Sequence, residues 1–365
     1  MAVNSSIPIS EIIYSSDDIP IPRTGFGSFW SQTTKEFVVF GGYNGEERLS
    51  DVWCLKRQSD LSSGSKQEVS KDEENEDFGC WKNVTPKNYK IEGRAGFTLV
   101  PTNKQNSWIL FGGYNSERFV LSDSHLLEIE KSNTNENKQE ETIENNDNRK
   151  QDINSEATFS TFSWKKITYI STPQNLERRW HSSCTIAEKM IVSYGWNDNG
   201  PLNDIKIFDL NSHRWSDLQP RGNMSARRWH TCCSKENKLF YFGGYDGKAL
   251  KDFSILDLEK NVFLSPKPTT KAPMERCRHT ATWVDSKQMA IIGGYADDSL
   301  PLKEIWIWRS DDSSWKLINS GIYFPSFKAG HSATMIDENK MLVFGGFDFS
   351  KNPTNTSVII DKRSF

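Results

Sequence analysis

Two nearly identical stretches, RRWHSSC and RRWHTCC, begin at Arg178 and Arg227. Each places two guanidinium groups, an indole and an imidazole on consecutive residues. Arginine binds carboxylate or phosphate through a bidentate fork, and tryptophan supplies rigid apolar contact area. Histidine serves as a general base or a metal ligand. The two copies are therefore either a duplicated active site or one position of a repeating scaffold, and the spacing of other motifs decides between these interpretations.

Short apolar runs that end in Gly-Gly-aromatic recur along the chain. They are FVVFGGY, WILFGGY, LFYFGGY, MAIIGGY and MLVFGGF, with first glycines at Gly41, Gly112, Gly243, Gly293 and Gly345. A sixth run, MIVSYGW, has Tyr194 in the first glycine position. The last three steps between these positions are 49, 50 and 52 residues, which indicates a repeating unit of about 50 residues.

The two longer steps contain polar segments, residues 58–79 and 131–160, which are rich in Asn, Glu, Lys and Ser. Such segments cannot bury enough apolar surface to offset the entropy lost on ordering. Without them, both steps shrink to the same period. We therefore predict a single domain over residues 1–365, with disordered insertions at 58–79 and 131–160 between the third and fourth strands of units 1 and 2.

Each unit contains four short apolar runs separated by Gly, Asn and Asp turns, and an aromatic residue leads the last run. These aromatic residues are Trp81, Trp164, Trp215, Phe263 and Trp315. The chain thus resembles the kelch-repeat β-propeller family over nearly its whole length. The resemblance implies an all-β fold, a six-bladed kelch β-propeller with four antiparallel strands per blade. The last unit stops after its third strand, so we expect Ile9–Tyr14 to supply the outer strand of blade 6 and close the ring.

Aligned by unit, the RRWH stretches fall at the start of the innermost strand. The fourth position of this motif is Phe26, Phe97, His181, His230, His279 or His331. A position that alternates between Phe and His behaves as a packing position, so we interpret these histidines as scaffold, hydrogen-bonded between blades. The first position is always a cation: Arg23, Arg94, Arg178, Arg227, Arg276 or Lys328.

These six cations allow two interpretations. By family resemblance they lie at the rim of the central channel, where kelch propellers bind ligands. Alternatively, each arginine anchors a loop through a neighbouring acid such as Glu92, Glu177 or Glu275, or through a carbonyl. In blades 3 to 5 a common glycine is replaced by a bulky residue, and two further arginines add charge. The candidate ligand-binding residues are therefore Arg23, Arg94, Arg178, Arg179, Trp180, Arg227, Arg228, Trp229, Arg276, Arg278 and Lys328.

The charge balance favours an acidic partner. The insertion 58–79 carries seven acidic and two basic residues, and 131–160 carries seven and four, so the remainder of this chain of net charge −3 is basic. The sequence contains no long basic stripe of the kind that predicts nucleic-acid binding. It also contains no apolar run long enough to span a membrane. The N-terminus lacks the features of a signal peptide and the six cysteines form no CxxC pair, so we expect a cytoplasmic protein. We also expect it to be a monomer.

The leading hypothesis is a non-enzymatic protein-interaction module or adaptor, without a cofactor or metal, that binds an acidic or carboxylate-terminated peptide at its basic, Trp-rich mouth. One alternative is a small-GTPase or trafficking effector. Another is a kelch-fold enzyme, either galactose-oxidase-like or a metal-dependent lyase. The lyase-like iron motif Glu-x3-Asp-x3-His is only half present, as Asp209 and His213, with Ile205 in the glutamate position.

Overall fold

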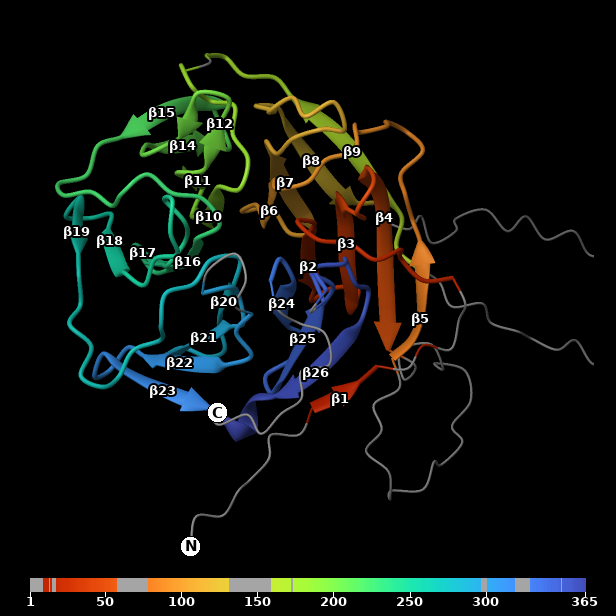
Figure 1. Cartoon of the computed structure of the whole chain (residues 1–365). Coiled ribbons are helices and arrows are strands. Elements are labelled where there is room, and N and C mark those ends of the chain that lie inside the picture. The colour runs from red at the N-terminus through yellow and green to blue at the C-terminus, as the bar shows by residue number, and fades with distance from the viewer. Residues whose placement is uncertain are drawn as a thin grey trace, which may run out of the picture.

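The structure is a computed structural model that describes residues 9–12, 14, 18–57, 78–130, 159–171, 173–296, 301–318, 329–348 and 350–365. Its strands form six four-stranded antiparallel sheets arranged around a central axis (Figure 1). Five of these sheets take consecutive strands from one unit, and the sixth combines both ends of the chain. This arrangement confirms the predicted six-bladed β-propeller.

The strands occupy equivalent places in every blade. The innermost strands are β2 (Gly27–Ser31), β6 (Thr98–Pro101), β10 (Ser182–Ile186), β16 (Thr231–Lys235), β20 (Thr280–Trp283) and β24 (Ser332–Met335). The second strands are β3 (Glu36–Tyr43), β7 (Ser107–Phe111), β11 (Lys189–Ser193), β17 (Lys238–Phe242), β21 (Gln288–Ile292) and β25 (Lys340–Phe344). The third strands are β4 (Arg48–Arg57), β8 (Ser124–Ile129), β14 (Ile205–Asp209), β18 (Phe253–Asp257), β22 (Ile305–Arg309) and β26 (Ser357–Asp361). The outer strands are β5 (Phe78–Asn83), β9 (Phe162–Ile167), β15 (Arg214–Leu218), β19 (Val262–Leu264), β23 (Ser314–Ile318) and β1 (Ile9–Glu11).

Two smaller elements complete the chain. A two-stranded hairpin, β12 (Trp196–Asn197) with β13 (Gly200–Pro201), lies between the second and third strands of blade 3. A short 3₁₀ helix, η2 (Lys362–Ser364), follows β26. Both depart from the regular four-strand pattern without altering it.

The innermost strands begin later than the sequence pattern suggested. In blade 1 the strand starts at Gly27 and not at Arg23, and in blade 3 it starts at Ser182 and not at Arg178. Between the motif arginine and the start of the strand, the backbone forms hydrogen bonds outside its own sheet. In blade 1 the Arg23 N–H donates to the Thr354 carbonyl of blade 6. These residues therefore form a connection at the channel mouth, outside the ladder of their own sheet.

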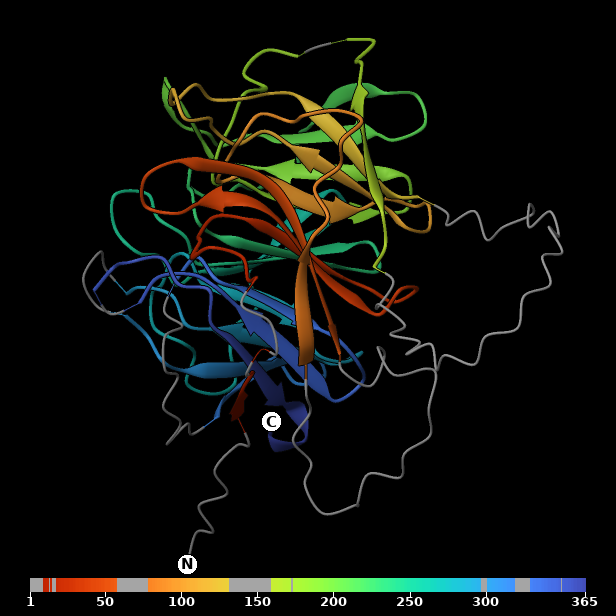
Figure 2. The same ribbon diagram turned by 90° about the vertical axis from the view of Figure 1, so that its right-hand side faces the viewer.

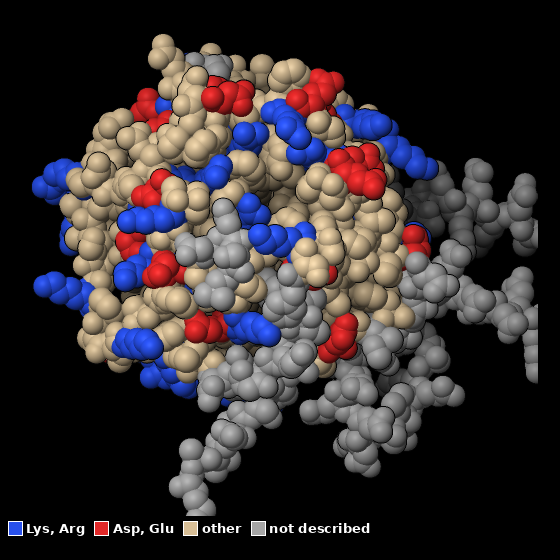
Figure 3. Space-filling view, in the orientation of Figure 1, with Lys and Arg blue, Asp and Glu red and all other residues tan. Residues whose placement is uncertain are grey.

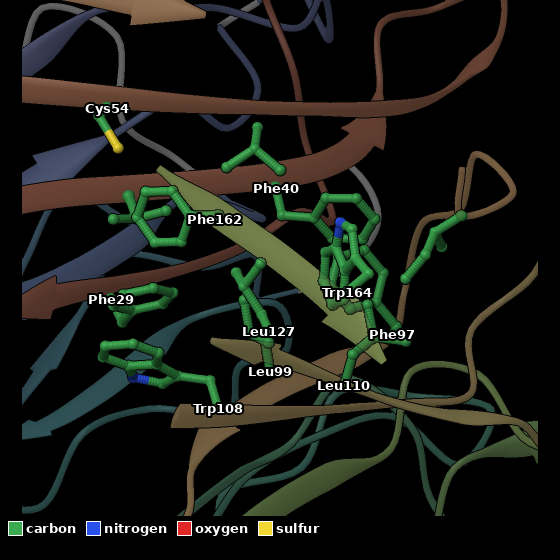
Figure 4. Packing of buried hydrophobic residues seen from close by; sticks show 13 residues of the cluster. Phe29, Phe40, Cys54, Phe97, Leu99, Trp108, Leu110, Leu127, Phe162 and Trp164 are labelled. Carbon is green, nitrogen blue, oxygen red and sulfur yellow. The ribbon is translucent and has the colours of Figure 1, made fainter. Parts of the chain in front are cut away.

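The apolar core is divided among the seams between blades. Six buried clusters each join two neighbouring blades, with members from the facing sides of both sheets. At the seam of blades 1 and 2, the rings of Phe29 and Trp108 stack with centroids 3.7 Å apart, and Phe40 packs edge-on against Trp164 (Figure 4). Aromatic pairs of this kind add to the free energy gained from burial alone.

The predicted ring closure is confirmed. Strand β1 pairs antiparallel with β26, with Ile9 opposite Ile360 and Glu11 opposite Val358. The Ile12 N–H adds a bond to the Ser357 carbonyl, and the Ile12 side chain is buried in the cluster between blades 6 and 1. In Figure 2 the red strand β1 lies beside the blue C-terminal part of this sheet. The outer edge of β26 is therefore covered.

The two polar insertions fall between β4 and β5 and between β8 and β9, which are third and fourth strands of blades 1 and 2. Residues 58–77 and 131–158 lie outside the described residues. The expected insertions end slightly earlier than 79 and 160. Residues 78 and 79 belong to β5, and the Ser160 N–H donates to the buried Glu36 carboxylate at 2.9 Å.

Closure by β1 predicts the effect of truncation. Removing residues 1–15 would leave β26 as an unpaired edge strand and uncover the cluster that Ile12 helps to bury. We expect a lower melting temperature and a tendency to aggregate, because an exposed edge strand offers unpaired backbone groups to another chain. Thermal melting with light scattering measures both effects. The variant Glu11→Gln keeps the strand and serves as the control, and equal melting of truncated and intact protein would contradict closure by β1.

Candidate functional site

Five of the six first-position cations are buried inside their blades. Arg23, Arg94, Arg178, Arg227 and Arg276 are each 2% exposed or less. They repeat one bonding pattern: Nε donates to the carbonyl two residues earlier, and Nη1 donates to the carbonyl of the first residue of the Gly pair or its Tyr194 equivalent. Each also meets a carboxylate at 2.6–2.9 Å, and the acids are Asp51, Asp123, Asp204, Asp252 and Glu304.

The partner carboxylates are themselves held in place. In four blades a donor two residues further along the third strand, on the same face, contacts the acid. These donors are Trp53, His125, Lys206 and Trp306. Although burial alone would raise the pKa of Asp123, hydrogen bonds from His125 and Arg94 outweigh it and hold that pKa well below its ordinary value. In these four blades the Arg–carboxylate pair is thus a fixed part of the blade.

This placement favours the loop-anchor interpretation for the five buried arginines and corrects its details. The acid partner is not the neighbouring glutamate: Glu92 instead accepts from Asn115 and Glu177 from Asn197. The partner lies about 25–30 residues downstream, at the start of the third strand. Blade 6 has Thr356 at the position of the acid, and its cation, Lys328, lies outside the described residues.

The fourth-position histidines link neighbouring blades, as the sequence interpretation proposed. In each case Nε2 lies 2.6–3.0 Å from a hydroxyl of the preceding blade. The pairs are His181 with Thr98, His230 with Ser182, His279 with Thr231 and His331 with Thr280. Burial lowers the pKa of His230 to about 3 and that of His331 to about 4. Burial also lowers the pKa values of His181 and His279 well below 6.5, so all four are neutral at physiological pH.

The third motif position forms a closed ring of main-chain hydrogen bonds around the channel mouth. Each N–H donates to the carbonyl of the equivalent residue in the preceding blade, at 2.7–3.5 Å, in the order Gly96 to Gly25, Trp180 to Gly96, Trp229 to Trp180, Arg278 to Trp229, Gly330 to Arg278 and Gly25 to Gly330. All six residues have φ between 56° and 67°. The ring thus imposes a left-handed backbone on every blade.

Three bulky residues therefore occupy a conformation that favours glycine. A left-handed backbone costs a non-glycine residue on the order of 1–3 kcal/mol, and such strain concentrates at functional sites. Trp180, Trp229 and Arg278 have φ of 56°, 58° and 56°. The sequence suggested no packing reason for these bulky residues. In the structure, however, Trp180 packs directly over Gly96, and a Cβ added to Gly96 would lie 2.6 Å from the Trp180 ring. All three remain half-buried at the rim.

Around this ring, aromatic and guanidinium groups alternate in what we call the rim arc. Its members are Tyr43, Arg48, Tyr114, Arg179, Trp180, Trp196, Arg228, Trp229, Tyr245, Arg278 and Phe347. Arg228 lies within 5.4 Å of four ring centroids, the closest being Trp229 at 4.0 Å. Arg278 lies 3.8 Å from the same Trp229 ring. Cation–π contacts of this kind fix the planes of the guanidinium groups.

The rim arc surrounds a cavity of about 320 Å³ at the channel mouth. All six ring positions line it, together with Tyr43, Tyr114, Phe347 and three of the channel histidines. Figure 3 shows Lys and Arg side chains gathered around the centre of this face, with most Asp and Glu side chains further out. Of the predicted site residues, Trp180, Trp229 and Arg278 line this cavity. Arg179 and Arg228 do not line it, but their guanidinium groups lie against the Trp180 and Trp229 rings that do.

Sequence reasoning missed Arg48 as a rim residue. It lies at the start of β4 and its guanidinium carbon is 4.7 Å from the ring centroids of both Tyr43 and Tyr114. Blades 2, 4 and 5 place Val120, Ala249 and Pro301 opposite the equivalent aromatic residue. Blade 1 differs from the other blades in having a cation at this position, and this difference was the sequence signal that could have identified Arg48 as a rim residue.

Within the described ranges, no group of three or more His, Cys, Asp or Glu side chains could hold a metal ion. No helix in the described part of the chain has the length and apolar character needed to cross a membrane. All six cysteines are free thiols.

A family model described as the KLHDC2/KLHL20/DRC7 Kelch-repeats domain matches residues 75–294 and 222–364. The chain belongs to this kelch-repeat family. The match and the structure agree on the fold, because the matched region covers blades 2 to 6. A kelch propeller fits a protein-interaction module in general terms.

Several curated kelch proteins are similar to this kelch chain. Kelch domain-containing protein 1 of Mus musculus is 25% identical over 54% of the chain and 55% of its own length. Kelch domain-containing protein 2 of Bos taurus is 30% identical over 42% of the chain and 36% of its own length. An F-box/kelch-repeat protein of Arabidopsis thaliana is 27% identical over 91% of the chain and 67% of its own length. The chain thus spans about a third to about half of the length of the first two.

Proposed function

We propose that this kelch propeller is a non-enzymatic interaction module whose rim arc binds an acidic or carboxylate-terminated peptide. The observation that carries the proposal is the set of guanidinium groups held against aromatic faces at the channel mouth, those of Arg179, Arg228 and Arg278. Arg278 and the rings of Trp180 and Trp229 line the 320 Å³ cavity. A carboxylate accepts two parallel hydrogen bonds from a guanidinium fork. Ring contacts already order these arginine side chains, so the side chains lose less conformational entropy when a ligand binds.

The strained backbone of Trp180, Trp229 and Arg278 supports the same site. Glycine fills the equivalent positions in blades 1, 2 and 6 without strain, so the bulky residues in blades 3 to 5 bring a backbone cost that glycine avoids. Tryptophan and arginine are also the residues most enriched at interface hot spots. The five buried arginines act in this proposal as anchors that hold the rim loops, and the ligand contacts fall to Arg179, Trp180, Arg228, Trp229 and Arg278.

We further propose a monomer in a reducing, cytoplasmic environment. The free thiols support the compartment, since the sulfur atoms of Cys184 and Cys232 lie 3.6 Å apart without a bond.

Restoring glycine at the rim tests the site. We expect the double variant Trp180→Gly, Trp229→Gly to melt close to the parent, because relief of backbone strain offsets the loss of two half-buried rings. Affinity for an acidic peptide selected from a random library should fall by about 1–3 kcal/mol per indole. Fluorescence anisotropy measures the affinity, and the same peptide with its acids replaced by amides, or with an amidated C-terminus, separates the two kinds of carboxylate. A double variant that melts far below the parent would show that these indoles are core residues.

A further inference from the structure

The rim sector formed by blades 1 to 3 contains two arginines against the ring of Tyr114 and a third in the connection that follows Tyr114. The guanidinium carbons of Arg48 and Arg179 lie 4.7 and 5.2 Å from the centroid of the Tyr114 ring. Arg118 lies in the connection that follows Tyr114, with an exposed side chain and a φ of 69°. Blades 1 and 3 thus place a cation against Tyr114, and blade 2 adds Arg118 in the connection that follows this residue.

These three arginines differ from the buried anchors in their charge balance. Each buried anchor meets a carboxylate, whereas no ion pair found among the described residues involves Arg48, Arg118 or Arg179. The Nε atoms of Arg48 and Arg179 are buried and make no hydrogen bond in the described part of the chain. Partial burial, with the charges of Arg48 and Arg118, lowers the pKa of Arg179, and Asp198 is the acid that opposes this shift. In the described part of the chain, these three guanidinium groups therefore lack the paired carboxylate that each buried anchor has.

We propose that Arg48, Arg118 and Arg179 bind the phosphate of a phosphorylated side chain in the partner peptide. This inference deepens the proposed function and rests on it. A phosphoryl group carries a charge between −1.5 and −2 near neutral pH and has three acceptor oxygens. Three guanidinium groups that form no ion pair among the described residues match a dianion better than the single charge of a glutamate. A phosphate at the edge of Tyr114 would lie beside the guanidinium groups of both Arg48 and Arg179, which already lie against this ring.

The test uses the full chain immobilised and three peptide libraries with random flanking residues and one fixed central residue: phosphoserine, glutamate or serine. We expect the phosphoserine library to be retained at least tenfold more strongly than the glutamate library. Arg48→Gln with Arg118→Gln should abolish this preference, as should Arg179→Gln. The control Lys248→Gln with Lys251→Gln removes the same net charge from exposed positions of blade 4 and should keep the preference.

The pH dependence gives a second measure. The phosphate loses its second charge near pH 6, so the preference for phosphoserine over glutamate should decline between pH 7.5 and 5.5. The titratable and charged groups near the proposed phosphate site are the three arginines, Tyr114, Glu47, Glu92, Glu117, Glu177 and Asp198. The channel histidines stay neutral in this range. A constant preference over this range would overturn the proposal.

The possible outcomes separate this inference from the proposed function. Equal retention of phosphoserine and glutamate libraries, both above serine, would overturn the phosphate site and leave an acidic-peptide site. A phosphoserine preference that survives Arg48→Gln with Arg118→Gln would place the phosphate elsewhere and also overturn it. Retention of none of the libraries would contradict the proposed function itself. If Arg48→Gln lowers the melting temperature, the exposed Arg118→Gln alone provides the test.

Discussion

Arg178→Met is expected to destabilise the propeller by about 3–5 kcal/mol, because it removes one partner of a buried charged pair. Arg178 is fully buried and donates to the Asp204 carboxylate and to the carbonyls of Asn175, Leu176 and Tyr194. Methionine has a similar length and no donor, so these acceptors would lose their partners in the folded state. Urea unfolding monitored by tryptophan fluorescence measures the loss.

The neighbouring residue provides a matched control. Arg179→Met removes the same charge one position further along, but Arg179 is half-buried at the rim and contacts Tyr114 and Trp180. We expect its unfolding midpoint to stay near that of the parent and its affinity for acidic peptides to fall. Equal stability losses in the two variants would contradict the division of this arginine pair into an anchor and a rim residue.

The second large effect concerns pH. The four channel histidines have folded-state pKa values far below the ordinary value of 6.5, so the unfolded chain binds more protons than the folded one. Their contribution to stability is fully present above pH 6.5 and is lost as the pH falls toward the folded-state values. Each proton taken up on unfolding lowers stability by about 1.4 kcal/mol per pH unit. Four such histidines remove most of a typical stability of about 5–15 kcal/mol by roughly pH 5.

Chemical denaturation at pH 7.5, 6.0 and 5.0 measures this loss. The variant His181→Phe removes one titrating group and introduces the residue that blades 1 and 2 use in this slot, Phe26 and Phe97. We expect its stability to fall less steeply with acid, by the equivalent of one proton. A parent whose stability stays constant between pH 7.5 and 5.0 would show that these histidines accept protons while folded.

The recurrence of the Gly pairs predicted the blades because each pair marks the same left-handed turn, as the φ values of Gly41 and Gly42 show. Ring closure by Ile9–Glu11 was also predictable, since the final unit lacked one strand. The burial of Arg23 was not, because its partner Asp51 follows at the start of the third strand and no local pattern joins the two. An acid at this place in five units, with Thr356 in the sixth, was the signal that could have revealed the anchors.

Five members of the rim arc were predicted as site residues, namely Arg179, Trp180, Arg228, Trp229 and Arg278, but the contacts that join the arc were not predictable, for a different reason. Ring contacts between blades depend on side chains that project from separate connections, such as Arg48 from blade 1 toward Tyr114 of blade 2. The repeat alignment identified Trp180 and Trp229 as exceptions to glycine, but their left-handed backbone became visible only with the main-chain ring.

That ring has a consequence for engineering the propeller. Because main-chain groups alone close it, the side chains it displays can be exchanged without redesigning the backbone, as the three natural departures from glycine already illustrate. The three remaining glycines differ in the space above them. An added Cβ at Gly96 would strike Trp180, and one at Gly330 would lie 2.3 Å from the Thr24 hydroxyl. At Gly25 the nearest atom would be 3.4 Å away, an ordinary contact. Gly25 of blade 1 is therefore a position at which an introduced side chain could extend the recognition surface or change its specificity. The only structural cost would be local backbone strain.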